Sequence, residues 1–301
     1  MNETTRRSTL GLSASALAAT LWGFGGIFAV LTFASGLVVA FYRLWLGAAL
    51  LTIVSYAVGQ RLSWATLRHT WLGGVFLAGD MMLFYCAVRL TSIVDVTVIG
   101  AFQPALMLIA ARKMFGERLG RWDVAWIVVA MAGVTIAVLG PSPAAHHRLA
   151  GDLLSVGALV SFSGYWIVSK RAREHTQAME YTAGVTIMAA AVTTVVVLAS
   201  SQALGRIHPA DWGWIVLLAI VPGSGHLIMN WAHRFVDASV SSAISCLAPL
   251  VAAVVAIPIL GQSLSVLQVV GELIGLAAIA VVAARNRQPV EPLADSVSSA
   301  D

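Results

Sequence analysis

Charge is scarce in this sequence. Asp, Glu, Lys and Arg make up 11% of the 301 residues, whereas soluble domains average about 25%. Hydrophobic residues reach 59%, and they form repeated apolar runs. A span of about 20 apolar residues is what a hydrocarbon core about 30 Å thick requires. The composition therefore predicts a polytopic membrane protein embedded in a lipid bilayer, rather than a soluble domain.

Cysteine is also scarce, and a nucleotide-binding motif is absent from the sequence. The two cysteines, Cys86 and Cys246, lie far apart in apolar runs, which is typical of packing residues rather than a disulfide or metal site. The sequence has no Gly-x-x-x-x-Gly-Lys-Ser/Thr loop, so an ion gradient or a solute gradient would have to drive any transport. We expect no cofactor and no metal. The net charge of +4 does not require nucleic acid, because cytoplasmic loops of membrane proteins collect Lys and Arg.

Hydropathy predicts ten helical spans. Residues 1–11 would precede them as a cytoplasmic segment, and residues 285–301 would follow them as a disordered cytoplasmic tail. Arg6-Arg7 and the apolar run after them resemble a signal peptide, but the run continues to Leu31 and is long enough to span. The expected spans are 12–31, 36–58, 71–90, 93–114, 122–140, 150–170, 180–202, 212–231, 238–260 and 265–284.

The basic residues test this topology. If the N-terminus is cytoplasmic, all Lys and Arg lie in cytoplasmic segments except Arg43, Arg89, Arg148 and Arg206. This is the bias of the positive-inside rule. The sequence thus predicts a bacterial-type inner-membrane protein with both termini in the cytoplasm.

An internal repeat organises the chain. Residues 85–138 recur without a gap at residues 230–283, and this places Pro104 on Pro249. Each half, 12–140 and 150–284, would contain five spans. Because five is odd, the second half must enter the membrane upside down. The fold class is therefore all-α, with ten transmembrane helices as two inverted five-helix repeats, a design that places a binding site between the halves and permits alternating access.

Short motifs in both halves resemble the EamA family of the drug/metabolite transporter superfamily. The resemblance covers roughly residues 12–284 and implies a ten-helix transporter, in many members an exporter of amino acids or other small metabolites, with a central cavity. One residue departs from the family pattern: Gln262 stands where a glutamate is usual, so an ion pair made by Glu117 cannot be repeated. The motifs are Leu21-Trp22-Gly23, Tyr42-Arg43, Pro104, Phe115-Gly116-Glu117-Arg118-Leu119, Pro249 and Leu260-Gly261-Gln262-Ser263-Leu264.

Three charged residues, Arg43, Asp80 and Glu272, fall deep within predicted spans. A charge at a helix centre costs about 2.5–3.5 kcal/mol on insertion scales, so each should face the protein interior or a cavity. One interpretation is a relay in which Asp80 or Glu272 carries a coupled proton. The other is a structural pair between Arg43 and one of the carboxylates.

Polar and proline residues share helix faces in three further spans. Pro222, His226 and Asn230 follow one another at four-residue spacing, so they would line a cavity or pack in the core. Gln103 with Pro104, and Ser245 with Pro249, mark the two related spans as cavity-lining and flexible, or as close-packed interfaces. Gly271 and Gly275 form a Gly-x-x-x-Gly stripe that can pack a helix of the same chain or a second copy in a homodimer.

Aromatic residues inside the spans complete the candidate cavity, where they can stack on a solute or simply fill the core. The predicted function is export of a small metabolite, amino-acid-like or drug-like, by alternating access, with H+ as a possible coupling ion and no enzymatic activity. The alternatives are a membrane-embedded enzyme using Asp80, His226 and Glu272, and a non-transporting scaffold. The candidate residues are Trp22, Tyr42, Arg43, Asp80, Tyr85, Gln103, Pro104, Tyr165, Trp166, His226, Asn230, Ser245, Pro249 and Glu272.

Overall fold

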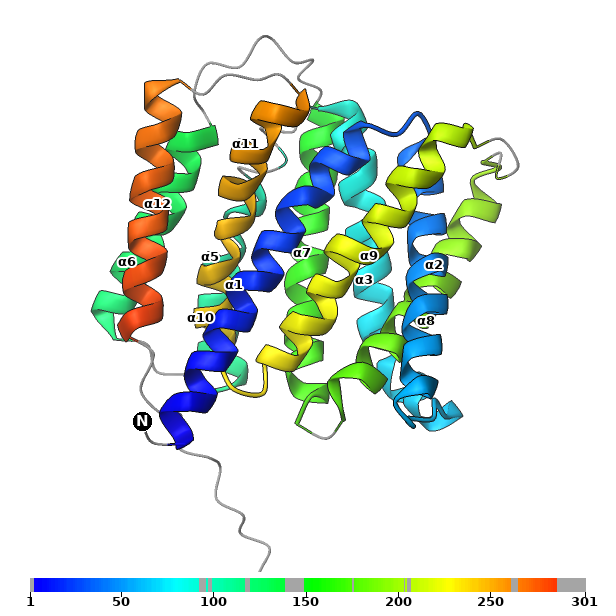
Figure 1. Ribbon diagram of the computed structural model, residues 1–301, viewed down its shortest axis with the longest axis horizontal. Coiled ribbons are helices and arrows are strands. Elements are labelled where there is room, and N and C mark those ends of the chain that lie inside the picture. Colours follow the sequence, from blue (N-terminus) through cyan, green and yellow to red (C-terminus); the bar gives the residue numbers. More distant parts are fainter. Residues whose placement is uncertain are drawn as a thin grey trace, which may run out of the picture.

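The computed structural model describes residues 3–91, 96, 99–116, 120–138, 149–174, 176–202, 204, 207–260 and 265–285. Within these ranges the chain is helical and contains no strand, and the helices run roughly along one common axis (Figure 1). They are α1 (Glu3–Val30), α2 (Gly36–Ala57), α3 (Trp64–Leu90), α5 (Gln103–Met114), α6 (Arg121–Val138), α7 (Leu149–Ala172), α8 (Ala178–Ala199), α9 (Pro209–Ala232), α10 (Ala238–Ser245), α11 (Leu247–Leu260) and α12 (Val266–Arg285).

The helices confirm the all-α polytopic fold. Six of them, α1, α2, α3, α7, α8 and α9, are long and apolar enough to cross a membrane. The shorter α5, α6 and α12, and α10 together with α11, supply the remaining predicted spans. Some helices begin earlier than hydropathy indicates. The side chain of Ser63 accepts a hydrogen bond from Thr66 N at 3.1 Å, so this cap starts α3 in a polar segment that the hydropathy profile does not count as a span.

The fourth and ninth spans are broken, although the sequence analysis treated each as one helix. Ala101 and Phe102 form a turn before α5, and Cys246 separates α10 from α11. Each break lies just ahead of a matched proline, Pro104 or Pro249. The prolines supply no N–H to the preceding turn, and the backbone there tightens to three-residue hydrogen bonds such as Cys246 N to Ala243 O at 3.2 Å.

Helices from opposite repeats pair with each other. α1 packs along α9 and α3 along α7, while α2 contacts α8 and α6 contacts α12. Since α1 corresponds to α7 and α3 to α9 in the repeat, the pairs α1–α9 and α7–α3 are equivalent contacts related by the internal symmetry. The chain begins α1 and ends α12 at the same end of the bundle (Figure 1). Both features are those of an inverted repeat with five spans per half.

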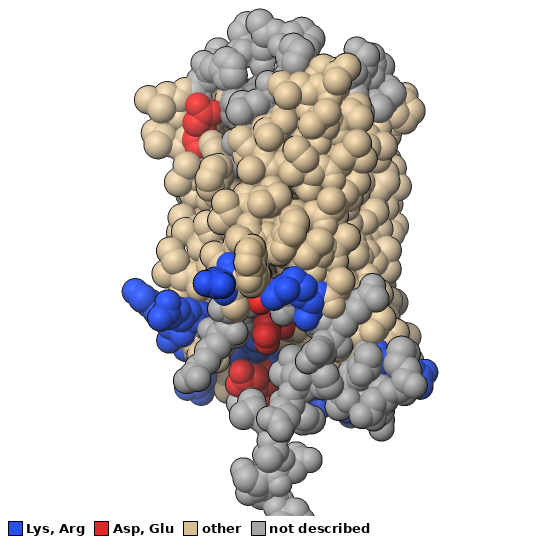
Figure 2. Space-filling model, turned by 90° about the vertical axis from the view of Figure 1, so that its left-hand side faces the viewer, with Lys and Arg blue, Asp and Glu red and all other residues tan. Residues whose placement is uncertain are grey.

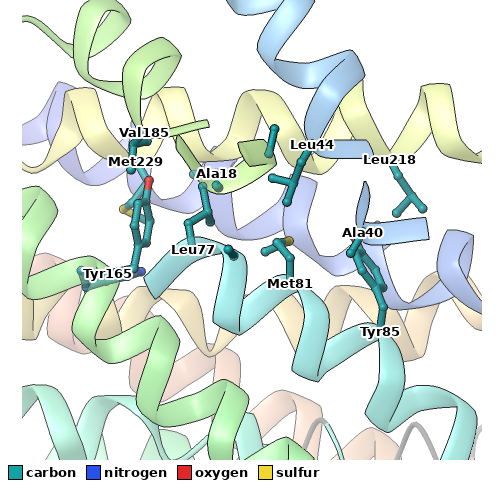
Figure 3. Close-up of a cluster of buried hydrophobic side chains, with 14 of the residues drawn as sticks. Ala18, Ala40, Leu44, Leu77, Met81, Tyr85, Tyr165, Val185, Leu218 and Met229 are labelled. Carbon is teal, nitrogen blue, oxygen red and sulfur yellow. The ribbon is translucent and has the colours of Figure 1, made fainter. Parts of the chain in front are cut away.

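Two hydrophobic cores hold the bundle together. In the first, Met81 and Tyr85 of α3 lie against Ala40 and Leu44 of α2 (Figure 3). The second surrounds α6, α10, α11 and α12. There a Cβ on Gly133 of α6 would lie 2.5 Å from the backbone N of Gly275. The Gly-x-x-x-Gly stripe of α12 therefore packs a helix of its own chain, and is not available to a second copy.

The link between α1 and α2 is fastened from two sides. The Asp211 carboxylate, at the start of α9, accepts hydrogen bonds from Phe33 N at 2.8 Å and Ala34 N at 3.0 Å. At the end of α3, Arg89 Nη2 donates to Ala29 O at 2.9 Å and Thr32 O at 2.7 Å. The guanidinium thus takes up carbonyls at the end of α1, which have no partner within the helix. These contacts tie the first helix to both repeats.

Basic side chains gather at one end of the molecule. Figure 2 shows the Lys and Arg residues of the face in view close to the end at which α1 begins, where some Asp and Glu residues also lie, whereas the described residues at the other end of this face include acidic residues but no Lys or Arg. This is the segregation that the sequence analysis derived from the order of the spans.

Candidate functional site

A cavity of about 190 Å³ lies between the two repeats. Helices α1, α2, α3, α5, α7, α9, α10 and α11 contribute to its wall, so both broken spans reach it. The wall combines aromatic rings with a few polar and charged groups. These side chains are Trp22, Arg43, Asp80, Phe84, Tyr85, Gln103, Ser155, Phe162, His226 and Ser245.

The cavity occupies the half of the bundle away from the termini. On α1 it is lined from Trp22 to Gly26, near the far end of that helix. On α7, which runs the opposite way, it is lined from Ser155 to Phe162, in the first part of the helix. Farther along α7, towards the termini, Trp166 is fully buried. The side of the termini is therefore closed beneath the cavity.

Arg43 joins α2 to α9 at the cavity wall. Its Nε donates to Leu218 O at 3.0 Å, its Nη1 contacts Met81 Sδ, and its guanidinium carbon lies 5.6 Å from the centre of the Tyr85 ring. Leu218 O is the carbonyl that the residue at position 222 would bind in a regular helix, and Pro222 has no N–H to give. The Arg43 side chain takes its place. The described contacts of Arg43 are thus a carbonyl, a sulfur and a ring, and they include no salt bridge with Asp80.

Asp80 places a carboxylate at the same cavity. It lies on α3 one turn before Phe84, and only 7% of the residue is exposed. Aromatic contacts surround the polar groups, with Trp22 and Phe162 rings 5.4 Å apart. The cavity thus presents a guanidinium group, a carboxyl group and apolar rings to the same small volume. Such a wall suits a small solute that carries both charges and an apolar part.

The two broken spans meet at Gln103 and Ser245. Ser245 Oγ donates to Gln103 Oε1 at 2.8 Å, so α10 is joined to the first turn of α5 beside the cavity. Pro249 lines the cavity, whereas Pro104 is buried behind the wall. The matched prolines therefore occupy related places in the fold but not in the cavity, because the second half approaches α1 more closely. A Cβ on Gly23 of α1 would lie 2.8 Å from Ala248 O.

Several predicted residues form the floor rather than the wall. Asn230 Nδ2 donates to Tyr165 Oη at 2.8 Å and to Thr182 Oγ1 at 3.0 Å, and Trp166 is packed beside them. Tyr42 lies elsewhere, and its hydroxyl donates to Leu204 O, between α8 and α9, at 2.7 Å.

Other predicted residues are not brought to the cavity or cannot be placed. Glu272 belongs to α12, whose neighbours are α6, α10 and α11, and its side chain lies outside the described residues. The loop residues Glu117 and Gln262 also lie outside the described part of the chain.

Three further wall residues were not predicted from the sequence, namely Phe162, Phe84 and Ser155. Phe162 precedes Trp166 by one helical turn and Phe84 follows Asp80 by one turn, so reading whole helix faces from the chosen residues would have included both. Ser155 lies two turns before Phe162 and has no feature in the sequence that separates it from other serines.

Ten spans in two inverted halves around a central cavity define a polytopic membrane protein of the transporter type. The sequence matches the EamA-like transporter family over residues 9–139 and 149–284, and the chain belongs to this family. It is 26% identical over 206 residues to the uncharacterized transporter YyaM of Bacillus subtilis (strain 168), covering 66% of this chain and 67% of that protein. A protein of known crystal structure superposes with a TM-score of 0.74 over 92% of this chain and 99% of its own, at 20% identity, which shows a shared fold.

Proposed function

We propose that this membrane transporter exports a small, amino-acid-like metabolite by alternating access. The observation that carries the proposal is the cavity between the inverted halves, where Arg43, Asp80 and aromatic rings share one wall. Arg43 suits a carboxylate, Asp80 suits an ammonium group, and Trp22 with Phe162 suits an apolar side chain. Family membership supports transport as the activity.

Cavity size favours a metabolite over a drug-like compound. Pockets for drug-sized ligands typically measure about 300–1,000 Å³, whereas this cavity measures about 190 Å³. A solute that fits must be small, and its charged groups must reach Arg43 and Asp80 across a short distance.

The placement of charge supports an orientation of the protein in the membrane, and with it the proposed direction of transport. Basic residues gather at the end at which α1 begins and α12 ends (Figures 1 and 2), which supports an inner-membrane protein with that end in the cytoplasm. The cavity then lies in the outer half, closed towards the cytoplasm, as in a state that releases an exported solute. Asp80 is the group we assign to a coupled proton, because a carboxylate in a poorly hydrated site can exchange a proton as the cavity alternates.

The enzyme interpretation requires Asp80, His226 and Glu272 to meet. Asp80 and His226 line the same cavity, but Glu272 belongs to α12 and that helix packs on α6. No observation in the described residues favours this second function, and we do not put it forward.

Flux into proteoliposomes tests the proposal. Purified full-length protein would be reconstituted and offered labelled zwitterionic amino acids, nucleosides and cationic dyes. We expect at least one zwitterionic amino acid to move faster than into protein-free liposomes. If none does, the proposed function is wrong, and movement of dyes alone would refute the size argument.

A cavity-filling variant supplies the control. Ala158 lines the cavity and is 4% exposed, while Val160, two residues on in α7, is 55% exposed on the lipid side. We expect Ala158→Trp to abolish flux and Val160→Trp to retain it. Size-exclusion profiles and unfolding midpoints would show that both variants are folded.

A further inference from the structure

A line of unpaired polar atoms continues from the cavity towards the termini. Most of the buried side-chain nitrogen and oxygen atoms that lack a hydrogen-bond partner in the described residues belong to it. Buried polar groups are normally satisfied, so a concentration of unsatisfied ones in one place points to something that is bound there in another state. The atoms are Trp22 Nε1, His226 Nδ1, Trp166 Nε1, Asn230 Oδ1, Arg173 Nη1 and both ring nitrogens of His233.

The line follows two helix faces below the cavity. On α7 and the turn after it, Phe162, Trp166 and Arg173 are spaced by four and seven residues, so they share a face. On α9 and the residue after it, His226 and His233 are likewise seven residues apart. Ring contacts connect the levels, with Phe162 and Trp166 centroids 5.8 Å apart and those of Trp166 and His233 4.8 Å apart. The same two faces therefore lead from the cavity to the end of the termini.

Arg173 and His233 close this end. They are only 5% and 4% exposed. Arg173 Nε donates to Asn230 O at 2.9 Å, which leaves Nη1 as a buried donor without a partner. Burial lowers the pKa of His233 to about 3, helped by the nearby charges of Lys170 and Arg173. At neutral pH the imidazole is therefore uncharged, with one N–H to donate.

The charges around this pair are mainly positive. Burial lowers the pKa of Arg173 to about 10, and Arg234 adds to the effect, while the phenol of Tyr181 on α8 opposes it. Asp237 is an acid at this end, and its carboxylate lies 3.8 Å from Lys170 Nζ. A buried guanidinium that donates to a backbone carbonyl, and to no carboxylate among the described residues, is energetically costly, and an anion would compensate its charge.

We propose that Trp166, Arg173 and His233 form an oxyanion-binding site at the cytoplasmic mouth of the path, which takes the carboxylate of the entering solute. The inference rests on the proposed function, and it places the solute's first contact before the central cavity. In the conformation described, the side chains close the mouth. When α7 and α9 separate there, the indole N–H, the guanidinium Nη1 and the imidazole N–H can converge on one carboxylate, for which arginine is the best-suited side chain.

Binding at this site should take up a proton. Without an anion the pKa of His233 is about 3, so the imidazole is neutral at pH 5.5 and at pH 7.5. A bound carboxylate favours the imidazolium and raises the pKa towards its ordinary value of about 6.5. Because the bound form then holds more protons, the affinity rises as pH falls. For a bound-state pKa of about 6.5, binding is on the order of tenfold tighter at pH 5.5 than at pH 7.5.

Tryptophan fluorescence measures the binding directly. Full-length protein in phosphatidylcholine nanodiscs would be titrated with sodium acetate and sodium phosphate against sodium chloride of equal ionic strength. We expect a saturable change with acetate that Trp166→Phe removes, since Trp166 becomes hydrated when the mouth opens. Arg173→Gln should weaken acetate binding at least tenfold. The control is Arg171→Gln, which removes the same charge from an exposed residue at the same helix end and should bind as the wild type does.

The outcomes separate this site from its alternatives and from the proposed function. Equal acetate binding in Arg173→Gln and the wild type, or a pH dependence that His233→Gln preserves, overturns the site. A response only when the nanodiscs contain phosphatidylglycerol assigns the cluster to a lipid headgroup, and overturns the solute assignment. An acetate response in the wild type that Arg173→Gln loses supports the site even if proteoliposomes show no flux. In that case the proposed transport function would be wrong, while the proposed binding site would stand.

Discussion

Replacing Arg43 by methionine should destabilise the protein strongly only while Pro222 is present. Arg43 Nε donates to Leu218 O at 3.0 Å, and the residue at position 222 would donate to that carbonyl in an unbroken helix. Arg43→Met alone leaves the carbonyl buried without a donor, which costs about 1–3 kcal/mol. In the Pro222→Ala background the new backbone N–H can take over, and the carbonyl stays satisfied.

The two substitutions should therefore couple by about 1.5 kcal/mol in a double-mutant cycle, because one missing donor separates the two backgrounds. Arg43→Met also removes the contact with the Tyr85 ring and a positive charge from the cavity of Asp80. Both losses occur with and without Pro222, so they cancel in the cycle. The free energy of unfolding of the four proteins would be measured in mixed micelles by circular dichroism during titration with a denaturing detergent.

Pro258 provides the control for the cycle, since it is another proline inside a helix, α11, and α11 is not among the neighbours of α2. Arg43→Met combined with Pro258→Ala should be additive within about 0.3–0.5 kcal/mol. A coupling below that limit for Arg43→Met with Pro222→Ala would refute the argument that the guanidinium replaces the missing N–H.

Three further predictions concern the cavity, the breaks in the fourth and ninth spans, and the link between α1 and α2. Asp80→Asn should raise the KM for a zwitterionic solute by about 10–100-fold, because it removes one charge-assisted hydrogen bond of about 1.5–3 kcal/mol. It should also flatten the pH dependence of flux in proteoliposomes. An unchanged KM and an unchanged pH profile would remove Asp80 from the site. Pro104→Ala and Pro249→Ala should both slow flux. The effect of Pro249→Ala should be larger, because Pro249 lines the cavity. Wild-type rates in both variants would show that the breaks in the two spans are not hinges. Asp211→Ala should lower the free energy of unfolding by about 2–5 kcal/mol, since two backbone N–H groups lose their acceptor, and a change below about 1 kcal/mol would mean that water replaces the carboxylate.

The sequence was sufficient for the helices and their order because hydropathy is a local property. Spans such as α2 and α8 lie where their apolar runs lie, since a bilayer selects about 20 apolar residues in a row. The matched prolines also indicated where the related spans are weakened. The exact breaks were missed, because a proline can kink a helix or interrupt it, and packing around Cys246 and Ala101 decides which occurs.

The candidate cavity was predicted in part. Charged and polar residues within spans must avoid lipid, so Arg43, Asp80 and His226 could be assigned to the interior, and all three line the cavity. Tyr42 was chosen as an aromatic residue within a span, but its hydroxyl donates to Leu204 O, between α8 and α9, and it does not line the cavity. To avoid lipid, a side chain needs only to point into the bundle, and a ten-helix bundle has buried regions that are not part of the cavity.

Amino-acid order alone determined the fold class, the inverted repeat and the family, because each depends on periodicity, charge segregation and motifs that recur along the chain. Only the tertiary structure decided that Arg43 binds the carbonyl that Pro222 leaves free, that the Gly271–Gly275 stripe faces Gly133, and that unpaired polar atoms run from the cavity to Arg173 and His233. The physical reason is that a hydrogen-bond partner or a packing neighbour from another helix is set by the docking of whole helices. Residues that meet in this way lie as far as 178 positions apart, and nothing in the sequence marks them as partners.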